Sequence, residues 1–326
     1  MSLTSSQTLV SAVDLGGTNL RAANIDGNGD IYERAKCRTP HTGDPDKIVS
    51  AIADAVAQCA KQAANRGQEV QAISIVVPGS VHSRTGLVVN APNVPALIDF
   101  GLTVALERKL QRPAFIENDA NAAAVGEMWK GAARGCRTIV CFTLGTGVGS
   151  GVILNGKLWR GIDGTGGEIG HTSVDPFGGA PCKCGNRGCL EVYASATGIV
   201  RMTRELLPEY PQSTLHALAA DLSAKTIAQA ARDQDACALR VFEKMSIYLG
   251  VAMANVVNAI NPEAIVIAGG VAAAFDLFAP TAREEMLRRA FPVPAQRCQI
   301  LKAECGDDAG LLGAARLAFQ QNQPAL

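Results

Sequence analysis

Short apolar runs interrupted by glycine open the chain and predict a β-hairpin. Thr8–Val13 is rich in apolar and β-branched residues, and Arg21–Ile25 has the pattern of a second strand. Between them lies Asp14–Thr18, whose two glycines favour a tight turn. We therefore expect two paired strands joined by a glycine tip.

Helical spacing follows the hairpin. From Ile48 onward apolar residues recur every three or four positions, and Gly67 is a suitable end for the helix. Ala72–Val77 is then short and mostly apolar, as in a buried strand, and it is followed by Pro78 and Gly79. The predicted order is hairpin, helix, strand.

The same order returns after a helix near Thr103–Leu110 and a short strand at Ala114–Ile116. Little sequence identity accompanies the repetition, so we expect an architectural duplication within an α/β protein. The second set comprises a strand at Thr138–Leu144, a glycine tip at Gly145–Gly149, a strand at Gly151–Leu154, a long helix around Leu239–Ile260 and a buried strand at Ala264–Ala268.

An irregular, glycine-rich stretch, Gly161–Gly188, separates these repeated parts. A loop of this length is uncommon in a compact domain unless it is functional or held in place. Near the C-terminus, Asp308 is a suitable N-cap for a helix that runs roughly to Gln320.

Composition narrows the class of protein. The 326 residues suit two domains or one large split unit, and 30 Lys and Arg balance 30 Asp and Glu. A net charge of zero disfavours nucleic acid as a partner, because phosphate-backbone binding needs a basic surface. The chain lacks both the ~20-residue apolar run of a membrane helix and the pattern of a secretory signal. We expect a compact cytoplasmic protein without a membrane partner.

The ten cysteines form two groups. Cys182, Cys184 and Cys189 are clustered, and His171 precedes them. Three thiolates and one imidazole complete a tetrahedral zinc set, so structural zinc is favoured, while the Cys-x-Cys spacing keeps a redox cluster as the alternative. The others stand alone and are expected to be reduced and to act as small hydrophobic residues: Cys37, Cys59, Cys136, Cys141, Cys237, Cys298 and Cys305.

Both glycine tips are suited to hold phosphate groups, because glycine permits close approach and backbone N–H groups can converge on an anion. One tip alone would favour an ordinary hairpin turn, but two at equivalent places favour a nucleotide. Neither is a Walker A loop, since the Gly156-Lys157 pair lacks the spaced upstream glycine. Neither is a Rossmann fingerprint, since Ser150 stands where the third glycine is needed.

Acidic residues at predicted strand ends are candidates for chemistry. Asp119, within Glu117–Asn121, follows a short strand just before a helix, where it could cap that helix or act as a general base. Asp14 also stands at a strand end. Because Mg²⁺ is commonly held by one or two carboxylates plus phosphates, Asp14 is a candidate metal-linked partner of a nucleotide.

These motifs resemble the ROK family, the group named for repressors, open reading frames and sugar kinases. The resemblance spans nearly the whole chain, and the cysteine-rich segment is its most specific part. It is carried by Asp14–Thr18, Pro78-Gly79, Ala91–Asn93, Glu117–Asn121, Leu144–Gly149, Gly167–His171, Cys182–Glu191, Ala268–Val271 and Gly306–Gly310.

The resemblance implies an actin-like, ribonuclease H-like ATPase fold with two α/β domains around a cleft. Residues 1–117, joined by a C-terminal helix at about 306–326, would form the smaller domain, and residues 118–305 the larger one with the zinc-binding insertion. The family also implies a homodimer.

The implied activity is ATP-dependent phosphorylation of a hexose at its 6-hydroxyl, with glucose the first choice and glycolysis the setting. Asp119 resembles the base that accepts the hydroxyl proton. The groups that resemble sugar ligands are Gly79, Asn93, Asn118, Asp119, Glu168, His171 and Glu191. By the same resemblance, the Mg²⁺-nucleotide phosphates would lie against Asp14, Gly16, Gly17, Thr18, Gly145, Thr146 and Gly147, the adenosine beside Gly269 and Gly270, and zinc on His171, Cys182, Cys184 and Cys189.

Two departures from the family pattern leave alternatives open. Family repressors carry a helix-turn-helix before the first phosphate loop, and only thirteen residues precede Asp14, which disfavours a DNA-binding regulator. Val94–Phe100 stands where many glucose kinases of the family have a Trp-containing loop, so the sugar identity stays open. The alternatives are an N-acetylglucosamine or N-acetylmannosamine kinase and a non-catalytic sugar-sensing regulator.

Overall fold

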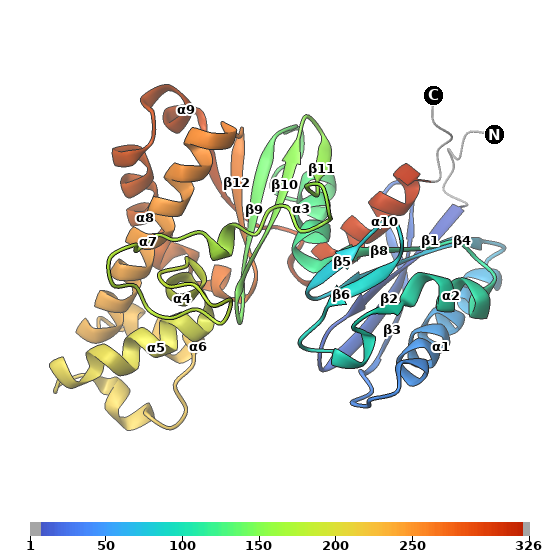
Figure 1. The fold of residues 1–326 in the computed structure, drawn as a ribbon, viewed down its shortest axis with the longest axis horizontal. Coiled ribbons are helices and arrows are strands. Elements are labelled where there is room, and N and C mark those ends of the chain that lie inside the picture. Colours follow the sequence, from blue (N-terminus) through green and yellow to red (C-terminus); the bar gives the residue numbers. More distant parts are fainter. Residues whose placement is uncertain (1–7, 322–326) are drawn as a thin grey trace. The chain divides into compact units, whose positions relative to one another are not determined.

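The computed structural model describes residues 8–321, which form two α/β units (Figure 1). The first unit contains the chain up to Gly135, the segment Leu158–Gly166 and the C-terminal part from Cys305. The second contains Cys136–Lys157 and Gly167–Glu304. Within residues 8–321, no helix is both long enough and apolar enough to cross a membrane.

A five-stranded sheet organises the first unit. Its strands are β1 (Thr8–Leu15), β2 (Asn19–Asp26), β3 (Ile31–Arg38), β4 (Glu69–Val77) and β8 (Ala114–Asn118). They lie in the order β3-β2-β1-β4-β8. The predicted hairpin is confirmed as the antiparallel pair β1–β2, and β4 and β8 extend the sheet in parallel. Strand β3 was not predicted, because Ala35 is the one buried residue among its eight and the sequence shows no apolar period there.

Helices cover both faces of this sheet, and alternate side chains along each strand pack against them. The helices are α1 (Pro45–Ala64), α2 (Leu102–Leu110), α3 (Asp119–Lys130) and α10 (Ala309–Gln321). Val13 and Ile75 belong to the apolar cluster shared with α1 and α2. Their neighbours Ala12 and Val76 belong to the cluster on the other face, shared with α3 and α10. This alternation is the period of two that a strand imposes.

Helices α3 and α10 meet backbone to backbone. A Cβ on Gly126 would lie 2.1 Å from the carbonyl oxygen of Ala309, and one on Gly313 would lie 1.8 Å from that of Ala122. Glycine is therefore required at both crossings. This contact places α3 in the first unit, which extends beyond residue 117, the boundary expected from the sequence.

A small sheet that was not predicted also belongs to the first unit. It consists of β5 (Ser80–His82), β6 (Leu87–Asn90) and β7 (Phe100–Gly101), with a short 3₁₀ helix at Pro95–Leu97. Such short strands carry too little periodicity to be recognised in a sequence.

The second five-stranded sheet repeats the strand order of the first. Its strands are β9 (Ile139–Leu144), β10 (Val148–Leu154), β11 (Lys157–Trp159), β12 (Ala264–Ala268) and β13 (Gln299–Lys302). The sheet runs β11-β10-β9-β12-β13, with an antiparallel pair β9–β10 and parallel neighbours β12 and β13. The architectural duplication predicted from the sequence is confirmed.

Helices accompany this second sheet (Figure 1). The longest, α7, begins at Ala236, because Asp235 caps its N-terminus through the N–H of Ala238. It ends at Ile260, where Asn261 adopts the left-handed conformation with φ 54°. The others are α4 (Glu191–Ala194), α5 (Ala196–Leu206), α6 (Ala224–Arg232), α8 (Phe275–Arg289) and α9 (Pro292–Arg297), with 3₁₀ turns at Ile169–His171, Leu207–Glu209, Thr214–Leu218 and Gly270–Ala274. A further 3₁₀ turn at Gly306–Asp308 precedes α10 in the first unit.

Candidate functional site

Asp119 is the first residue of α3, directly after β8. The N-cap of this helix is Asn118, whose Oδ1 accepts the N–H of Asn121 at 3.0 Å. The alternative that Asp119 caps α3 is therefore wrong. Extended backbone at Asn118 turns its short side chain back over the helix N-terminus, which is the geometry of a cap. Asp119 keeps its carboxylate for other contacts.

Two hydrogen bonds orient the Asp119 carboxylate. Its Oδ1 accepts the N–H of Ala120 at 2.9 Å and the Nδ2–H of Asn118 at 3.0 Å. The same Nδ2 also donates to the carbonyl oxygen of Gly79 at 2.8 Å. Because β4 and β8 are parallel neighbours, their carboxyl ends bring the turn at Gly79 beside Asn118.

Gly79 itself requires glycine. Its φ is 113°, and a Cβ there would lie 2.1 Å from the carbonyl oxygen of Asn90. Asn93, three residues further on, lies against the first glycine tip, since a Cβ on Gly17 would come within 3.0 Å of the Asn93 Cβ. The first unit therefore gathers Gly17, Gly79, Asn93, Asn118 and Asp119, which the sequence spreads over a hundred residues.

The environment of Asp119 favours its protonated form more than water does. Solvent still reaches the side chain, but surrounding protein atoms displace much of its hydration, and this loss raises the pKa of Asp119 to about 6. The charge of Asp14 raises this pKa further, while the hydrogen bonds from Ala120 and Asn118 lower it. A carboxyl group that titrates near neutral pH is suited to accept a proton.

The first glycine tip borders a charged pocket of about 340 Å³. The N–H of Gly16 donates to the carbonyl oxygen of Asn19, and Arg21 donates to the carboxylate of Asp14. Arg21 and Lys36 are partners in the β2–β3 register. The residues that line the pocket are Asp14, Gly16, Thr18, Asn19, Arg21, Lys36 and Asp307.

Arg21, Lys36 and Asp307 were not assigned a role by the sequence analysis. Arg21 follows the tip within the hairpin, so its position beside Asp14 could have been inferred from strand pairing. Lys36 lay on an unpredicted strand, and Asp307 reaches Arg21 at 3.4 Å from the far end of the chain. Only the folded sheet brings these three charges to one pocket.

The second glycine tip is held by backbone contacts within the second unit. The N–H of Gly145 donates to the carbonyl oxygen of Gly147, and Thr197 Oγ1 donates to that of Thr146 at 2.8 Å. Glu191 Oε2 accepts the N–H of Val148 at 3.1 Å. A pocket of about 420 Å³ lies here, lined by Thr146, Gly147, Pro181, Lys183, Glu191, Val192, Thr197, Gly198 and Arg201.

A more apolar pocket of about 580 Å³ lies at Gly270. Gly269 precedes it with φ 85°, and a Cβ on Gly269 would lie 2.5 Å from the carbonyl oxygen of Leu144. The Gly-Gly pair therefore lets β12 turn sharply against β9. The pocket is lined by Ile199, Ala224, Lys225, Thr226, Ala228, Gln229, Arg232, Phe242, Gly270, Val271, Ala273 and Ala274.

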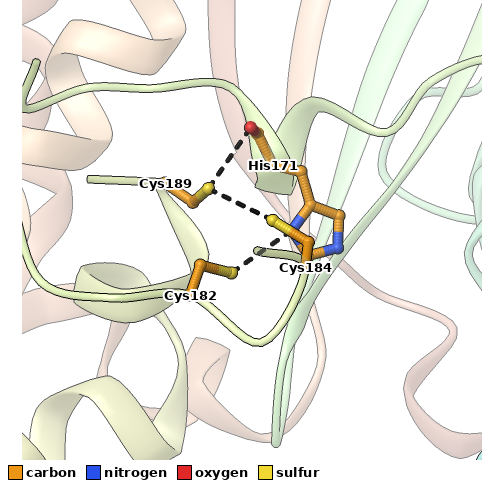
Figure 2. A group of neighbouring side chains, drawn as sticks. All are labelled: His171, Cys182, Cys184 and Cys189. Atoms are coloured by element: carbon orange, nitrogen blue, oxygen red, sulfur yellow. Dashed lines mark hydrogen bonds between the residues drawn. The ribbon is translucent and has the colours of Figure 1, made fainter. Parts of the chain in front are cut away.

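Four metal-ligating side chains converge in the irregular stretch of the second unit. The ligand atoms of His171, Cys182, Cys184 and Cys189 all lie within 4.8 Å of one another. Cys184 Sγ and Cys189 Sγ are 3.7 Å apart, and Cys182 Sγ lies 3.6 Å from His171 Nδ1 (Figure 2). A tetrahedral zinc with Zn–S bonds of about 2.3 Å needs sulfur atoms about 3.8 Å apart. The donor set and spacing therefore fit zinc.

The remaining predicted sugar ligands lie near this cluster or just before it. Glu191 Oε1 is 3.8 Å from Cys182 Sγ, so Glu191 and His171 both adjoin the cysteine cluster. Glu168 is exposed, one residue before the 3₁₀ turn that carries His171. The predicted sugar set is thus divided: Glu168, His171 and Glu191 belong to the second unit, and the others to the first.

Comparison with known proteins identifies the family of this chain. The model of the ROK family matches residues 10–321. The chain belongs to the ROK family. Among ROK-like sequences, a glucokinase of Halalkalibacterium halodurans is 40% identical over 313 residues, covering 95% of this chain and 94% of that protein.

A solved structure extends the likeness to three dimensions. The ROK family glucokinase from Streptomyces griseus, in complex with glucose and AMPPNP, has a TM-score of 0.80 and 34% identity, over 96% of this chain and 99% of that one. The actin-like α/β fold class predicted from the sequence is confirmed. A xylose repressor of Bacillus spizizenii is 32% identical over 248 residues, which are 76% of this chain and 61% of that protein.

Proposed function

We propose that the protein is an ATP-dependent hexose kinase that phosphorylates glucose at its 6-hydroxyl. The observation that carries this proposal is the Asp119 carboxyl group, which has a pKa of about 6, is oriented by Asn118 and lies close enough to Asp14 to sense its charge. A base of this kind near the charged pocket that Asp14 lines is what transfer from a nucleotide to a hydroxyl requires.

Asp119 acts as the general base in the proposed reaction. Its carboxylate accepts the proton of the sugar 6-hydroxyl while that oxygen bonds to the γ-phosphorus of ATP. The bond between the γ-phosphorus and the bridging oxygen breaks at the same time, and ADP leaves. Phosphoryl transfer depends mainly on positioning and charge stabilisation, so the chain needs no nucleophile of its own.

The charged pocket at the first tip is the proposed site of the phosphates. Arg21 and Lys36 supply positive charge there, and the backbone N–H groups of Gly17 and Thr18 would face the phosphates, while that of Gly16 holds the tip closed on Asn19. The partly exposed carboxylate of Asp14 is suited to Mg²⁺, which takes one or two carboxylates and keeps phosphates and water as further ligands. When bound, Mg²⁺ would neutralise charge on the phosphates.

We place the remaining nucleotide contacts on the second unit. Gly145, Thr146 and Gly147 form a tip whose backbone is already fixed by Thr197 and Glu191, so ordering it costs little on binding. The apolar pocket at Gly270, with Gly269 at its edge, has a size and lining that suit adenosine.

Sugar hydroxyls are assigned to the polar groups around Asp119 and around the cysteine cluster. Gly79, Asn93 and Asn118 would serve on the first unit, and Glu168, His171 and Glu191 on the second. Each buried hydroxyl needs a partner, and these groups supply both donors and acceptors.

Zinc is proposed as the structural ion of the cysteine cluster. Nδ1 of His171 faces Cys182, and Figure 2 shows the other ring nitrogen on the side away from the sulfur atoms. If Nδ1 bound the metal, Nε2 would carry the proton and could donate a hydrogen bond to a sugar hydroxyl. The ion would thereby fix the tautomer and the orientation of the imidazole.

An ATP-consumption assay against a panel of hexoses tests the proposal. Glucose should be the best substrate by kcat/KM, with measurable activity on mannose or N-acetylglucosamine. Because Asp119 must be charged to accept a proton, kcat should fall as the pH is lowered through about 6. Absence of ATP consumption with every hexose would instead favour a non-catalytic sugar-sensing regulator, an alternative in keeping with the similarity to a xylose repressor.

Two finer proposals concern the preferred sugar and the oligomeric state. Preference for N-acetylglucosamine or N-acetylmannosamine over glucose in the same panel would change the substrate without changing the mechanism. The homodimer that the family implies is tested by light scattering on the purified chain, where a monomer at micromolar concentration would contradict it.

A further inference from the structure

A buried carboxylate beneath the proposed base is held by three donors. Glu117, the residue before the α3 cap, has a side chain that is only 4% exposed. Its Oε1 accepts the backbone N–H of Asn118 and the Nδ2–H of Asn121, both at 3.0 Å. Its Oε2 accepts Nε–H of Arg160 at 2.7 Å. Burying a carboxylate is costly unless its charge is paired, and Arg160 supplies the paired charge for Glu117.

Glu117 thereby controls both ends of the cap that orients Asp119. Asn118 is bound through its backbone N–H to Glu117, and its side chain bonds Asn121 N–H and Asp119 Oδ1. Asn121 is bound to the same Glu117 oxygen through its own side chain. A displacement of the Glu117 carboxylate would therefore move the first turn of α3, and Asp119 with it.

Arg160 begins a loop whose two ends, Arg160 and Gly166, are joined by a backbone hydrogen bond. The N–H of Gly166 donates to the carbonyl oxygen of Arg160 at 2.8 Å, and a Cβ on Gly166 would lie 2.7 Å from the Arg160 carbonyl carbon. A Cβ on Gly164 would lie 2.8 Å from the carbonyl oxygen of Val81, so this loop also rests on β5. Arg160 is thus presented to Glu117 from a fixed backbone.

We propose that Arg160 is a positioning residue for phosphoryl transfer, acting through Glu117 and Asn118 to hold the Asp119 carboxylate in its productive orientation. This inference rests on the kinase function proposed above. Arg160 is assigned no contact with sugar or nucleotide. Its effect should therefore appear in kcat, while the KM for ATP stays unchanged.

Chemical rescue is the sharpest test, because Arg160 also lines a pocket of about 930 Å³ that belongs to the first unit. Arg160→Ala should lower kcat on the order of 10²-fold, the cost of a small misplacement of reacting groups. Millimolar guanidinium chloride should restore part of that loss, because the free cation can enter the pocket and pair with Glu117. Arg160→Lys should lie between the wild type and Arg160→Ala.

Two further variants separate positioning from loss of folding. Glu117→Gln removes the buried charge, and the double variant with Arg160→Ala should be more active than Arg160→Ala alone, since it leaves no unpaired carboxylate. Arg112→Ala is the matched control: it breaks the exposed Arg112–Glu69 pair of the same unit, with N–O 3.1 Å, and should leave kcat unchanged. A melting curve for each variant confirms that it is folded.

Amide hydrogen exchange makes the test independent of activity. In Arg160→Ala, the N–H groups of Asn118 and Asn121 should exchange faster than in the wild type, whereas those of α1 should not change. Slower turnover with neither faster exchange nor guanidinium rescue would overturn the proposal. If the wild type consumed no ATP with any hexose, the kinase function would fail, and unchanged exchange at Asn118 and Asn121 would then reject the positioning role as well.

Discussion

The two units repeat one strand order around two glycine tips, but they place different chemistry beside them. In the first unit, Asp14 faces Arg21 one residue pair before the tip of the β1–β2 hairpin. The corresponding pair of the β9–β10 hairpin is Thr143 and Gly149, neither of which is charged. One backbone plan thus carries a charged pair on the hairpin itself in one unit. In the other unit, the charged groups of the pocket at the tip, Lys183, Glu191 and Arg201, come from outside the hairpin.

The strands at the far side of each sheet differ in the same way. β8 ends at Asn118 and is followed by Asp119, whereas its counterpart β13 ends at Lys302 and is followed by Ala303. The second unit instead carries the cysteine cluster. The two sheets are similar frameworks that carry different side chains at the carboxyl ends of their strands.

The largest effect is expected from Asp119→Asn, which removes the proposed base from the first unit. The amide keeps the size of the side chain but accepts no proton, so kcat should fall by ~10² to 10⁴. Calorimetric titration should show glucose binding largely retained. A variant that kept most of its kcat would assign Asp119 a structural role and end the proposed mechanism.

Asp14→Asn compared with Thr143→Ala tests the difference between the two hairpins directly. Loss of the carboxylate should raise the Mg²⁺ concentration needed for half-maximal rate by roughly 10- to 100-fold, the scale found for disrupted metal sites. Thr143→Ala changes the equivalent position of the second unit and should leave the Mg²⁺ dependence unaltered. An equal shift of the Mg²⁺ dependence in the two variants would contradict the proposed difference between the two tips.

Cys184→Ser tests the role of the cysteine cluster, which the second unit has and the first unit lacks among its described residues. It should lower bound zinc, measured by elemental analysis, and weaken glucose binding by roughly 10-fold through the loosened His171. ATP binding should change less, because the charged pocket at the first tip belongs to the other unit and only the second tip adjoins the cluster, through Glu191. Cys37→Ser, at an exposed cysteine of β3, is the control.

A zinc-free native protein, or unchanged sugar affinity in a folded Cys184→Ser sample, would break the link between cluster and sugar. Unfolding of the whole chain would assign the cluster a purely structural role, since structural zinc contributes to folding free energy. Calorimetry on a sample shown to be folded distinguishes these outcomes.

The smallest effect is expected from Thr197→Val at the second tip. It removes the hydrogen bond to the Thr146 carbonyl oxygen, worth about 1 kcal/mol, and should raise the KM for ATP about five-fold with kcat little changed. Steady-state kinetics at saturating Mg²⁺ provides the measurement. A loss as large as that of Asp14→Asn would show that the second tip contributes as much as the charged one.

Local pattern predicted the central strands and the long helix well. β12 was predicted with the bounds it has, Ala264–Ala268, because an uninterrupted apolar run lies between Pro262 and two glycines. The strands missed were short or exposed, such as β3 and β5. Their residues are specified by partners in the sheet rather than by a hydrophobic period of their own.

The candidate functional motifs could be recognised in the sequence because each consists of residues close together in the chain: a glycine tip, a Cys-x-Cys run, an acid between a strand and a helix. The residue that caps α3 is decided by backbone dihedral angles. Only the structure therefore identified Asn118, rather than Asp119, as the cap. The raised pKa of Asp119 likewise depends on atoms from several segments.

What the sequence by itself determined about this protein is its duplicated α/β plan, its family and the residue types that would meet a sugar and a nucleotide. Only the tertiary structure paired Arg21 with Lys36 across two strands, and Arg160 with Glu117, 43 residues away in the chain. The physical reason is that hydrophobic period and turn chemistry act over a few residues, whereas charge pairing and loss of hydration act through space and depend on every segment that the fold brings together.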